Sequence, residues 1–510
     1  MRTRIAVGLL VAGLVAAGLP VAASAANPAV VRVENGQVRG TADAEARQFL
    51  GLPYAAPPLG RLRWEPPRRA PDWPGVRPAV EVGPGCPQPT GLPISAADQS
   101  EDCLTLNVTA PADARRAPVV VYFHGGSFNY GVSGNYDPRA MAVQGDVVVV
   151  TLNYRLGVFG FLAHPAFGDA ANLGLADQQA ALRWVRRNAS AFGGDPRNVT
   201  IMGQSAGGHS VCAHLAAPTS AGLFQRAITQ SAPCAGDNTH PLADAERQAL
   251  ALAAEVGCPD LRAASRCLRD KSPAELVAAS GAGHDDYRPV SGTALLPLDP
   301  AAAIASGRFN RVPVLHGSAH DEEGGQLGGL ELLPGAEPLS EEDYPLRIAD
   351  LYGPDAEAVL AEYPLAAYPT PSEALVAVLT DVNWARPAYE THVALARRVP
   401  TYAYEFAERD TSWFPGFPEP SFPVGASHML DLPYLFDVAY LTEAPRPELR
   451  DTMIAYWTTF ARKGNPNTAG LPTWPKFHSG QYVQSLAAGQ VRGTNFAEDH
   501  HYAFWQNLDR

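Results

Sequence analysis

The chain has 510 residues, of which 46% are hydrophobic and 18% charged, a composition that suits a packed core and excludes a disordered or low-complexity protein. Its 52 Asp and Glu residues outnumber its 39 Lys and Arg residues, which gives a formal net charge of −13. A field of this sign repels phosphate backbones, so neither a nucleic-acid partner nor an anionic membrane surface is expected.

Residues 1–25 have the pattern of an export signal. Arg2 and Arg4 precede an apolar run over residues 5–22, and the following Ala-Ser-Ala supplies the small side chains that a signal peptidase accepts. A membrane anchor is the alternative, but glycines and a proline interrupt the run and the cleavage site follows directly. We expect cleavage after Ala25 and secretion of residues 26–510. No later segment is apolar for long enough to span a bilayer, so no membrane anchor is expected.

The rest of the chain alternates short β-branched runs with longer helical patterns. Continuous apolar runs are typical of strands covered on both faces, and a helical pattern over residues 176–188 lies between two of them. This order predicts an α/β fold with a mostly parallel central sheet flanked by helices. No repeat or proline-rich linker marks a domain boundary. The expected strands are residues 119–123, 147–153, 198–203, 226–230 and 312–316.

A glycine-rich loop follows the first expected strand, with the sequence HGGSF at residues 124–128. Loops of this kind at a strand end offer backbone N–H groups to a developing oxyanion, because glycine lets the main chain approach the substrate closely. We assign the donors to Gly126 and Ser127, together with Ala206 further along the chain. His124 could be taken for a base, but its position favours a structural role in bracing the turn.

The expected strand at residues 198–203 is followed by a possible nucleophile. Residues 203–208 read GQSAGG, a G-x-S-x-G pattern between a strand and a helix expected to begin near Ala206. In that context Ser205 would sit on a strained turn above the sheet, with the positive end of a helix behind it. The pattern is weak when it stands alone, since an ordinary glycine turn can match it by chance. Its place between a strand and a helix favours a nucleophile.

A serine nucleophile needs a base and an orienting carboxylate, which in this kind of fold follow in the order Ser, Asp or Glu, His. Three carboxylates lie on the loop beyond residue 316, namely Asp321, Glu322 and Glu323, and the residues alone do not choose among them. Of the later histidines, His428 stands out modestly because a Gly-Ala-Ser loop precedes it and an apolar segment follows. The other downstream histidines are His392, His478, His500 and His501.

Six cysteines in a chain expected to be secreted favour three disulfides over free thiols. The number of cysteines does not determine which of them pair with one another. Local closure favours Cys86 with Cys103 and Cys258 with Cys267, and the remaining two cysteines would form a third pair or stay as buried thiols. A zinc site is the alternative, but no CxxC motif or His/Cys cluster at ligand spacing is present, so no metal is expected.

These motifs resemble those of the type B carboxylesterases, the cholinesterase-like branch of the α/β-hydrolase superfamily. The resemblance extends over nearly the whole chain and includes GLPYAAPPLGRLRW at 51–64, EDCLTLNV at 101–108, NYRLGVFGF at 153–161 and FGGDP at 192–196. It implies one large catalytic domain. It also implies a triad of Ser205 as nucleophile, Glu322 as acid and His428 as base.

The resemblance bears on other residues as well. It implies the Cys86–Cys103 and Cys258–Cys267 disulfides, leaves the pairing of Cys212 with Cys234 open, and makes Arg63 and Glu101 a buried structural ion pair. The chain departs from many relatives at two positions. Ser127 replaces a third glycine, which puts a side chain at the donor loop. Glu323 stands where glycine often follows the acid, which leaves Glu323 as an alternative to Glu322.

The expected reaction is hydrolysis of a small-molecule carboxylic ester through an acyl-enzyme, with no metal and no organic cofactor. One alternative is a hydrolase-fold binding protein without catalysis, although all three triad positions are filled here. Another keeps the chemistry but acts on an amide, a carbamate or a polyester. The acyl and alcohol groups of the substrate and the oligomeric state stay open.

Overall fold

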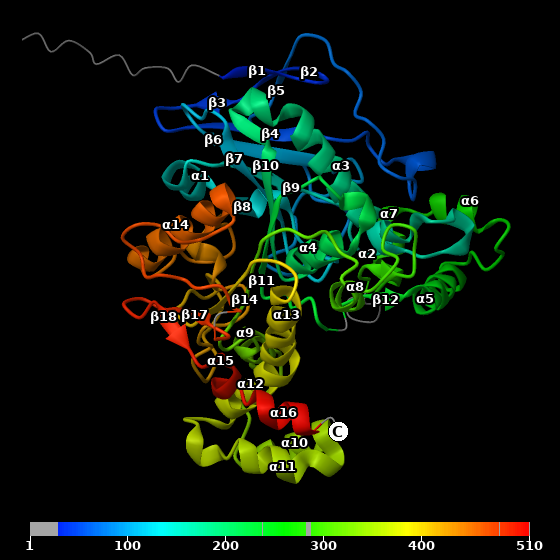
Figure 1. Cartoon of the computed structure of the whole chain (residues 1–510). Coiled ribbons are helices and arrows are strands. Elements are labelled where there is room, and N and C mark those ends of the chain that lie inside the picture. The colour runs from blue at the N-terminus through cyan, green and yellow to red at the C-terminus, as the bar shows by residue number, and fades with distance from the viewer. Residues whose placement is uncertain (1–28, 237, 282–286, 479, 509–510) are drawn as a thin grey trace, which may run out of the picture.

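The computed structural model describes residues 29–236, 238–281, 287–478 and 480–508. The expected export signal at residues 1–25 lies outside the described residues. One large sheet organises the molecule (Figure 1), and its strands follow the order β18-β17-β15-β14-β11-β10-β7-β9-β6-β4-β3. These strands are β3 (Thr41–Ala42), β4 (Ala46–Pro53), β6 (Thr105–Pro111), β7 (Ala117–Phe123), β9 (Val148–Leu152), β10 (Gly194–Gln204), β11 (Arg226–Gln230), β14 (Val314–Ala319), β15 (Thr401–Phe406), β17 (Val483–Leu486) and β18 (Arg492–Thr494).

The expected mostly parallel sheet is confirmed. From β9 through β7, β10, β11, β14 and β15 to β17, each neighbouring pair is parallel. Antiparallel pairs occur at the two ends of the sheet, where β6, β4 and β3 follow β9 and where β18 follows β17. All five expected strands belong to the parallel part, so the carboxyl ends of β7, β10 and β14 lie along one edge.

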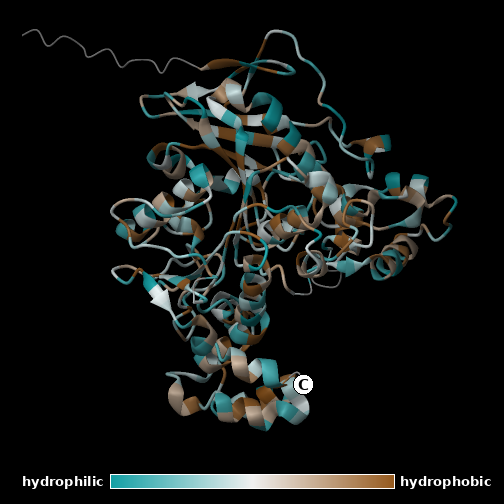
Figure 2. Ribbon diagram, in the orientation of Figure 1, coloured by the Kyte–Doolittle hydropathy of each residue, from teal (hydrophilic) through white to brown (hydrophobic). Residues whose placement is uncertain are grey.

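The sheet separates two hydrophobic cores, because side chains alternate along a strand. In β7, Val119, Val121 and Phe123 belong to one core, which is covered by α3, α4 and α8. Val120 and Tyr122 face the other core, which is covered by α1 and α14. These helices are α1 (Arg139–Gly145), α3 (Leu173–Asn188), α4 (Ala206–Ala216), α8 (Pro300–Ser306) and α14 (Pro447–Lys463). Coloured by hydropathy, the outer helices alternate hydrophilic and hydrophobic segments (Figure 2).

The remaining helices surround this centre. Those at the end of the molecule opposite β1 and β2, which include α10, α11, α12 and α16, enclose a small core of their own (Figure 1). The helices not yet given are α2 (Gly157–Phe161), α5 (Leu242–Glu255), α6 (Ala264–Arg269), α7 (Pro273–Ala279), α9 (Gly324–Glu331), α10 (Asp343–Tyr352), α11 (Ala356–Glu362), α12 (Pro371–Thr380), α13 (Arg386–Ala396), α15 (Phe496–Asp499) and α16 (Tyr502–Leu508). A π-helical turn at Asp381–Ala385 joins α12 to α13.

Over the described residues, the smaller strands form three minor sheets. They are β1 (Val30–Val33), β2 (Gly36–Arg39) and β5 (Val76–Pro78); β8 (Tyr136–Asp137) and β16 (Asp437–Val438); and β12 (His240–Pro241) and β13 (Val290–Ser291). No helix within the described ranges is both long enough and apolar enough to cross a bilayer. The ion pair implied for Arg63 and Glu101 is confirmed, since two guanidinium nitrogens each lie 2.6 Å from a carboxylate oxygen.

Candidate active site

Ser205 sits on a sharp turn between β10 and α4. Its φ of 56° and ψ of −128° are strained for a residue that carries a Cβ atom. Two backbone hydrogen bonds hold the turn, because the Ser205 N–H donates to the Gln230 carbonyl at 2.9 Å and the His209 N–H donates to the Ser205 carbonyl at 2.9 Å. The strand before the serine and the helix after it therefore both fix its backbone.

The glycines of the GQSAGG sequence are required by close backbone contacts. A Cβ atom on Gly203 would lie 2.2 Å from the carbonyl oxygen of Gly207, and one on Gly207 would lie 1.9 Å from that of Phe123. Neither contact leaves room for a side chain. The absence of a side chain at Gly203 lets β10 and α4 pack closely at the turn, and its absence at Gly207 lets α4 approach β7.

The structure brings Glu322 and His428 together. His428 Nδ1 lies 2.6 Å from Glu322 Oε2, while the other carboxylate oxygen accepts the N–H of Ala319 at 2.7 Å. The His428 N–H also donates to the Glu322 carbonyl at 3.1 Å. Burial lowers the pKa of His428, but the charge and hydrogen bond of Glu322, assisted by nearby acidic groups, outweigh burial and leave that pKa raised above 6.5.

The neighbouring carboxylates have other partners. Glu323 Oε1 accepts the indole N–H of Trp384 at 2.7 Å, and Asp321 forms an ion pair with Arg409 at 2.8 Å. Of the three carboxylates on this loop, Glu322 alone contacts His428. The Trp384 ring packs beside the imidazole, with ring centroids 4.8 Å apart.

His428 also approaches the turn that carries Ser205. Its Nε2 lies 3.2 Å from the side-chain amide nitrogen of Gln204, the residue before the serine. A Cβ atom built on Gly125 would lie 2.9 Å from Gln204 Oε1 and 3.0 Å from Ser205 Cβ. The serine, the glutamine side chain and the glycine loop therefore meet at one point.

The glycine loop leaves β7 in a conformation unusual for L-residues. Gly126, Ser127 and Phe128 have φ values of 109°, 52° and 59°. The carbonyl of Gly126 accepts the N–H groups of Asn129 and Tyr130, but within the described ranges the N–H groups of Gly126 and Ser127 donate to no other protein group. The Ser127 side chain is exposed. Ala206 is the first residue of α4, so its N–H has no acceptor inside the helix.

His124 has the environment of a structural residue. Its buried ring stacks on Tyr154 with centroids 4.6 Å apart, and the Tyr154 hydroxyl donates to the His124 carbonyl at 2.8 Å. Burial lowers the pKa of His124 to about 4, so the ring stays neutral at ordinary pH. These contacts support the bracing role expected for it.

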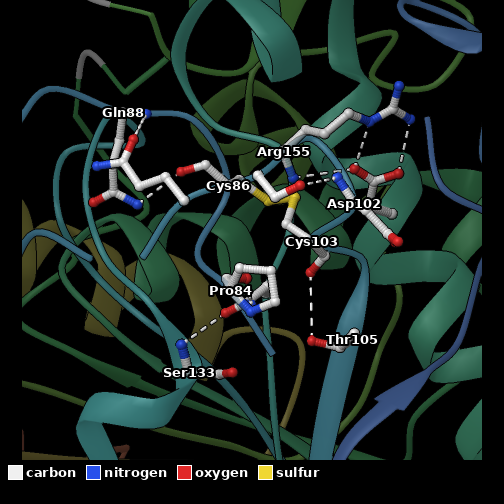
Figure 3. The surroundings of a disulfide bond; sticks show 12 residues. Pro84, Cys86, Gln88, Asp102, Cys103, Thr105, Ser133 and Arg155 are labelled. Carbon is white, nitrogen blue, oxygen red and sulfur yellow. Dashed lines mark hydrogen bonds and ion pairs between the residues drawn. A yellow bond between two sulfur atoms is a disulfide. The ribbon is translucent and has the colours of Figure 1, made fainter. Parts of the chain in front are cut away.

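Disulfides brace the loops around the site. The expected Cys86–Cys103 bond is present (Figure 3), and within the same loop the Gln88 amide donates to the carbonyls of Cys86 and Gly131, each at 2.9 Å. Gly131 donates back to Gln88 Oε1 at 2.9 Å, which joins this cross-linked loop to the end of the glycine loop.

The other cysteines are paired as well. The expected Cys258–Cys267 disulfide is confirmed, and Cys212, whose pairing the sequence left open, is bonded to Cys234. The second of these bonds ties α4, the helix behind Ser205, to the segment that follows β11.

The sequence patterns did not identify several residues near the site. Gln204 directly precedes the serine, and this position is a signal that its side chain lies at the site. No pattern indicated Trp384. Asp431 is buried, and its Oδ2 accepts the Gln230 amide at 2.5 Å. Burial, assisted by the charge of Glu322, raises the pKa of Asp431 to about 6.

In the part of the chain that the structure describes, no group of metal-binding side chains lies at Ser205. Among the described residues, one group could hold a metal ion, namely His320, Glu405 and His500. It lies beside the loop that carries Glu322, because His320 precedes that residue by two positions.

Comparison with known proteins decides the family. Residues 27–505 match the model of the Carboxylesterase family. The chain belongs to this family. The carboxylesterase is 36% identical over 476 residues to para-nitrobenzyl esterase of Bacillus subtilis (strain 168), covering 88% of this chain and 92% of that protein. It is 34% identical to acylcarnitine hydrolase of Mus musculus, with 90% and 87% covered.

Solved structures agree with this assignment. A thermophilic PNB esterase superposes on the carboxylesterase with a TM-score of 0.77 at 34% identity, covering 94% of this chain and 100% of that one. The α/β-hydrolase fold implied by the motifs is therefore confirmed, as is the expected family. The carboxylesterase is a carboxylic ester hydrolase.

Proposed function

We propose that this carboxylesterase hydrolyses esters with a triad of Ser205, His428 and Glu322. In this mechanism His428 Nε2 takes the proton of the Ser205 hydroxyl as that oxygen attacks the ester carbonyl. Glu322 holds the imidazole through Nδ1 and stabilises the imidazolium that forms. The observation that carries the proposal is the 2.6 Å contact between Glu322 and His428 beside the strained Ser205 turn.

The tetrahedral intermediate places a negative oxygen near the glycine loop. We assign its hydrogen-bond donors to the N–H groups of Gly126, Ser127 and Ala206. By analogy with other oxyanion holes, each donor contributes about 3 kcal/mol in the transition state. Ser127 serves through its backbone N–H, which donates to no other group among the described residues, while its side chain is exposed. His428 then protonates the leaving alcohol, and water hydrolyses the acyl-enzyme after transfer of its proton to His428.

We infer a small-molecule carboxylic ester as the substrate. The names of the relatives, para-nitrobenzyl esterase and acylcarnitine hydrolase, both describe ester cleavage and support this class. An amide, a carbamate or a polyester substrate would use the same groups, and relative rates on matched ester and amide substrates distinguish these cases.

We also propose that residues 1–25 are an export signal and that the mature domain, residues 26–510, is secreted. Three disulfides support this location, since such bonds persist in oxidising compartments. The family match begins at residue 27, just beyond the expected cleavage site. Sequencing the N-terminus of the exported protein tests both statements, and a chain that still begins at Met1 would contradict them.

Replacement of the nucleophile tests the mechanism. Ser205→Ala is expected to fold and to lose on the order of 10⁴ to 10⁶ in kcat on a chromogenic short-chain ester. Ser190→Ala, which alters an exposed serine, serves as the matched control and keeps full activity. A Ser205→Ala variant with the turnover of the unchanged protein would overturn the assignment.

The same experiment addresses the alternative of a binding protein without catalysis. An organophosphate is expected to label the unchanged protein with one equivalent at Ser205 and to leave the Ser205→Ala variant unlabelled, as mass spectrometry of the peptides would reveal. A protein that neither reacts with the organophosphate nor cleaves esters would favour the binding role.

A further inference from the structure

A second cluster of polar side chains lies behind the loop that carries Glu322. His320 follows β14, Glu405 lies in β15 and His500 follows α15, and the ligand atoms of these three side chains all lie within 4.8 Å of one another. Glu405 and His500 are buried, and His320 is partly buried. The sheet fixes two members, because β14 pairs in parallel with β15 and the His320 N–H donates to the Phe406 carbonyl at 2.9 Å.

Carboxylates face ring nitrogens of both histidines in this cluster. His500 Nδ1 lies 2.5 Å from Asp381 Oδ1, and His320 Nδ1 lies 3.1 Å from Asp321 Oδ1. Asp381 can keep the proton on His500 Nδ1 while Nε2 binds an ion, an arrangement that recurs around metal-binding histidines. His320 Nδ1 also lies 3.2 Å from the Arg409 guanidinium, which can only donate, so Asp321 contacts the His320 ring without fixing its tautomer. His500 Nε2 faces Glu405 Oε1 at 2.7 Å.

Two of the three proposed ligands, His320 and His500, line a cavity, and Glu405 lies behind them. A hollow of about 290 Å³ is lined by His320, Asp381 and His500, together with residues of α12 and of the segment before His428. This volume accommodates an ion with bound water, which a site with three protein ligands needs in order to complete its coordination. The cavity also provides a path by which the ion can enter.

We propose that His320, Glu405 and His500 form a binding site for a divalent transition metal of the zinc class. Two imidazoles and one carboxylate are ligands that suit Zn²⁺, whereas Mg²⁺ and Ca²⁺ prefer oxygen ligands. The ion would displace the proton by which His500 Nε2 bonds to Glu405 Oε1, and the 2.7 Å between these two atoms would widen to admit it. The His320 side chain is 32% exposed and closes onto the ion, while Asp381 and Asp321 orient the two rings.

The site would have a mechanical consequence for the catalytic loop. Asp321 separates His320 from Glu322, and its Oδ2 accepts the N–H of Ala426, two residues before His428, at 2.9 Å. An ion on His320 would therefore hold the start of the segment from which Glu322 reaches His428. The ligands are 85 and 95 positions apart in the chain, which is why no ligand spacing revealed them.

Metal titration of the full chain tests the proposal. Protein treated with a chelator and then freed of it is expected to bind one equivalent of Zn²⁺, and with Co²⁺ to develop the visible absorption of a cobalt ion bound by nitrogen and oxygen ligands. His320→Gln is the deciding variant, because this partly exposed ring can be replaced with little disturbance of the fold. It should lose the equivalent, and Asp381→Asn should weaken binding by about 10- to 100-fold.

His478→Gln is the matched control, since His478 is exposed and lies outside the cluster. It should bind one equivalent like the unchanged protein, and circular dichroism should confirm that each variant is folded. Failure of the unchanged protein to bind Zn²⁺, or one full equivalent still bound by folded His320→Gln protein, would overturn the site. Neither result would depend on ester hydrolysis, because the measurement counts bound metal.

Discussion

The side-chain amide nitrogen of Gln204 lies 3.2 Å from His428 Nε2, the ring nitrogen that takes the proton of Ser205 in the proposed mechanism. An amide nitrogen can only donate a hydrogen bond, so this contact requires an unprotonated Nε2. The ring proton is then on Nδ1, facing Glu322. Gln204 and Glu322 thus hold the two nitrogens of the imidazole in the form that a general base needs.

Gln204→Glu should shift the dependence of activity on pH. A carboxylate beside Nε2 favours the protonated ring, so the pKa of His428 should rise further above 6.5. Only the neutral ring accepts the serine proton, so kcat/KM should fall near neutral pH and recover in alkali. The acidic limb of kcat/KM on a chromogenic ester measures this shift. Gln37→Glu adds the same charge at an exposed site and should leave the limb in place. An unmoved limb in Gln204→Glu would contradict the contact.

Glu322→Gln and Glu323→Gln should separate the two adjacent carboxylates. Glu322→Gln removes the charge that holds the imidazole and should lower kcat on the order of 10⁴-fold, as loss of the orienting acid does in other serine hydrolases. The same change removes the main influence that raises the pKa of His428, so any remaining activity should extend to lower pH. Glu323→Gln alters a group bonded to Trp384 and should keep kcat within about tenfold. Reversed results would make Glu323 the catalytic acid.

Gly207→Ala should damage the nucleophile turn, whereas Gly329→Ala should not harm the protein. Both glycines lie in helices, but a Cβ atom on Gly207 would meet the Phe123 carbonyl oxygen at 1.9 Å, while one on Gly329 would meet nothing within 4 Å. We expect the first change to cost at least about 2 kcal/mol of unfolding free energy and most of the activity. The second should be neutral or stabilise by up to about 1 kcal/mol. Urea denaturation of the two variants side by side provides the measurement.

Removal of the Cys212–Cys234 disulfide should destabilise the fold without removing a catalytic group. The two cysteines are 22 positions apart, and closing a loop of this length is worth about 3 kcal/mol in the chain-entropy model. The Cys212→Ala, Cys234→Ala double variant should therefore unfold at lower urea concentration. Reduction of the unchanged protein breaks all three disulfides and should lower the midpoint at least as far. A double variant with the midpoint of the unreduced, unchanged protein would argue against the bond.

Much of the fold could be predicted from local patterns. Strands buried on both faces contain continuous apolar runs, so β7, β9, β10, β11 and β14 were all anticipated within a few residues. Other strands were not predicted, because polar residues interrupt their apolar runs. β6 is fully buried yet contains Thr105, Asn107 and Thr109, and β15 contains the buried Glu405. The Asn107 amide donates to the hydroxyls of Ser133 and Thr151, and Glu405 bonds to His500. A local pattern does not reveal such distant partners.

Parts of the candidate site could likewise be predicted from local patterns, whereas others depend on tertiary contacts. The Ser205 turn and the glycine loop are local structures, so spacing was sufficient to find them. The choice of Glu322 over Glu323 depends on which side chain points to His428, 106 positions away, and rested on family resemblance. The contact of Gln204 with that ring and the cluster around His500 arise only from tertiary packing.

The strained backbone of Ser205 has a practical consequence for engineering this esterase. Glycine adopts a φ of 56° without steric cost, whereas serine pays roughly 1–3 kcal/mol there. Exchanging the serine for glycine would relax the chain while deleting the hydroxyl. Laboratory evolution that rewarded survival of heating alone would therefore drift toward robust but inert protein. Each round of such a campaign should score turnover together with thermal survival.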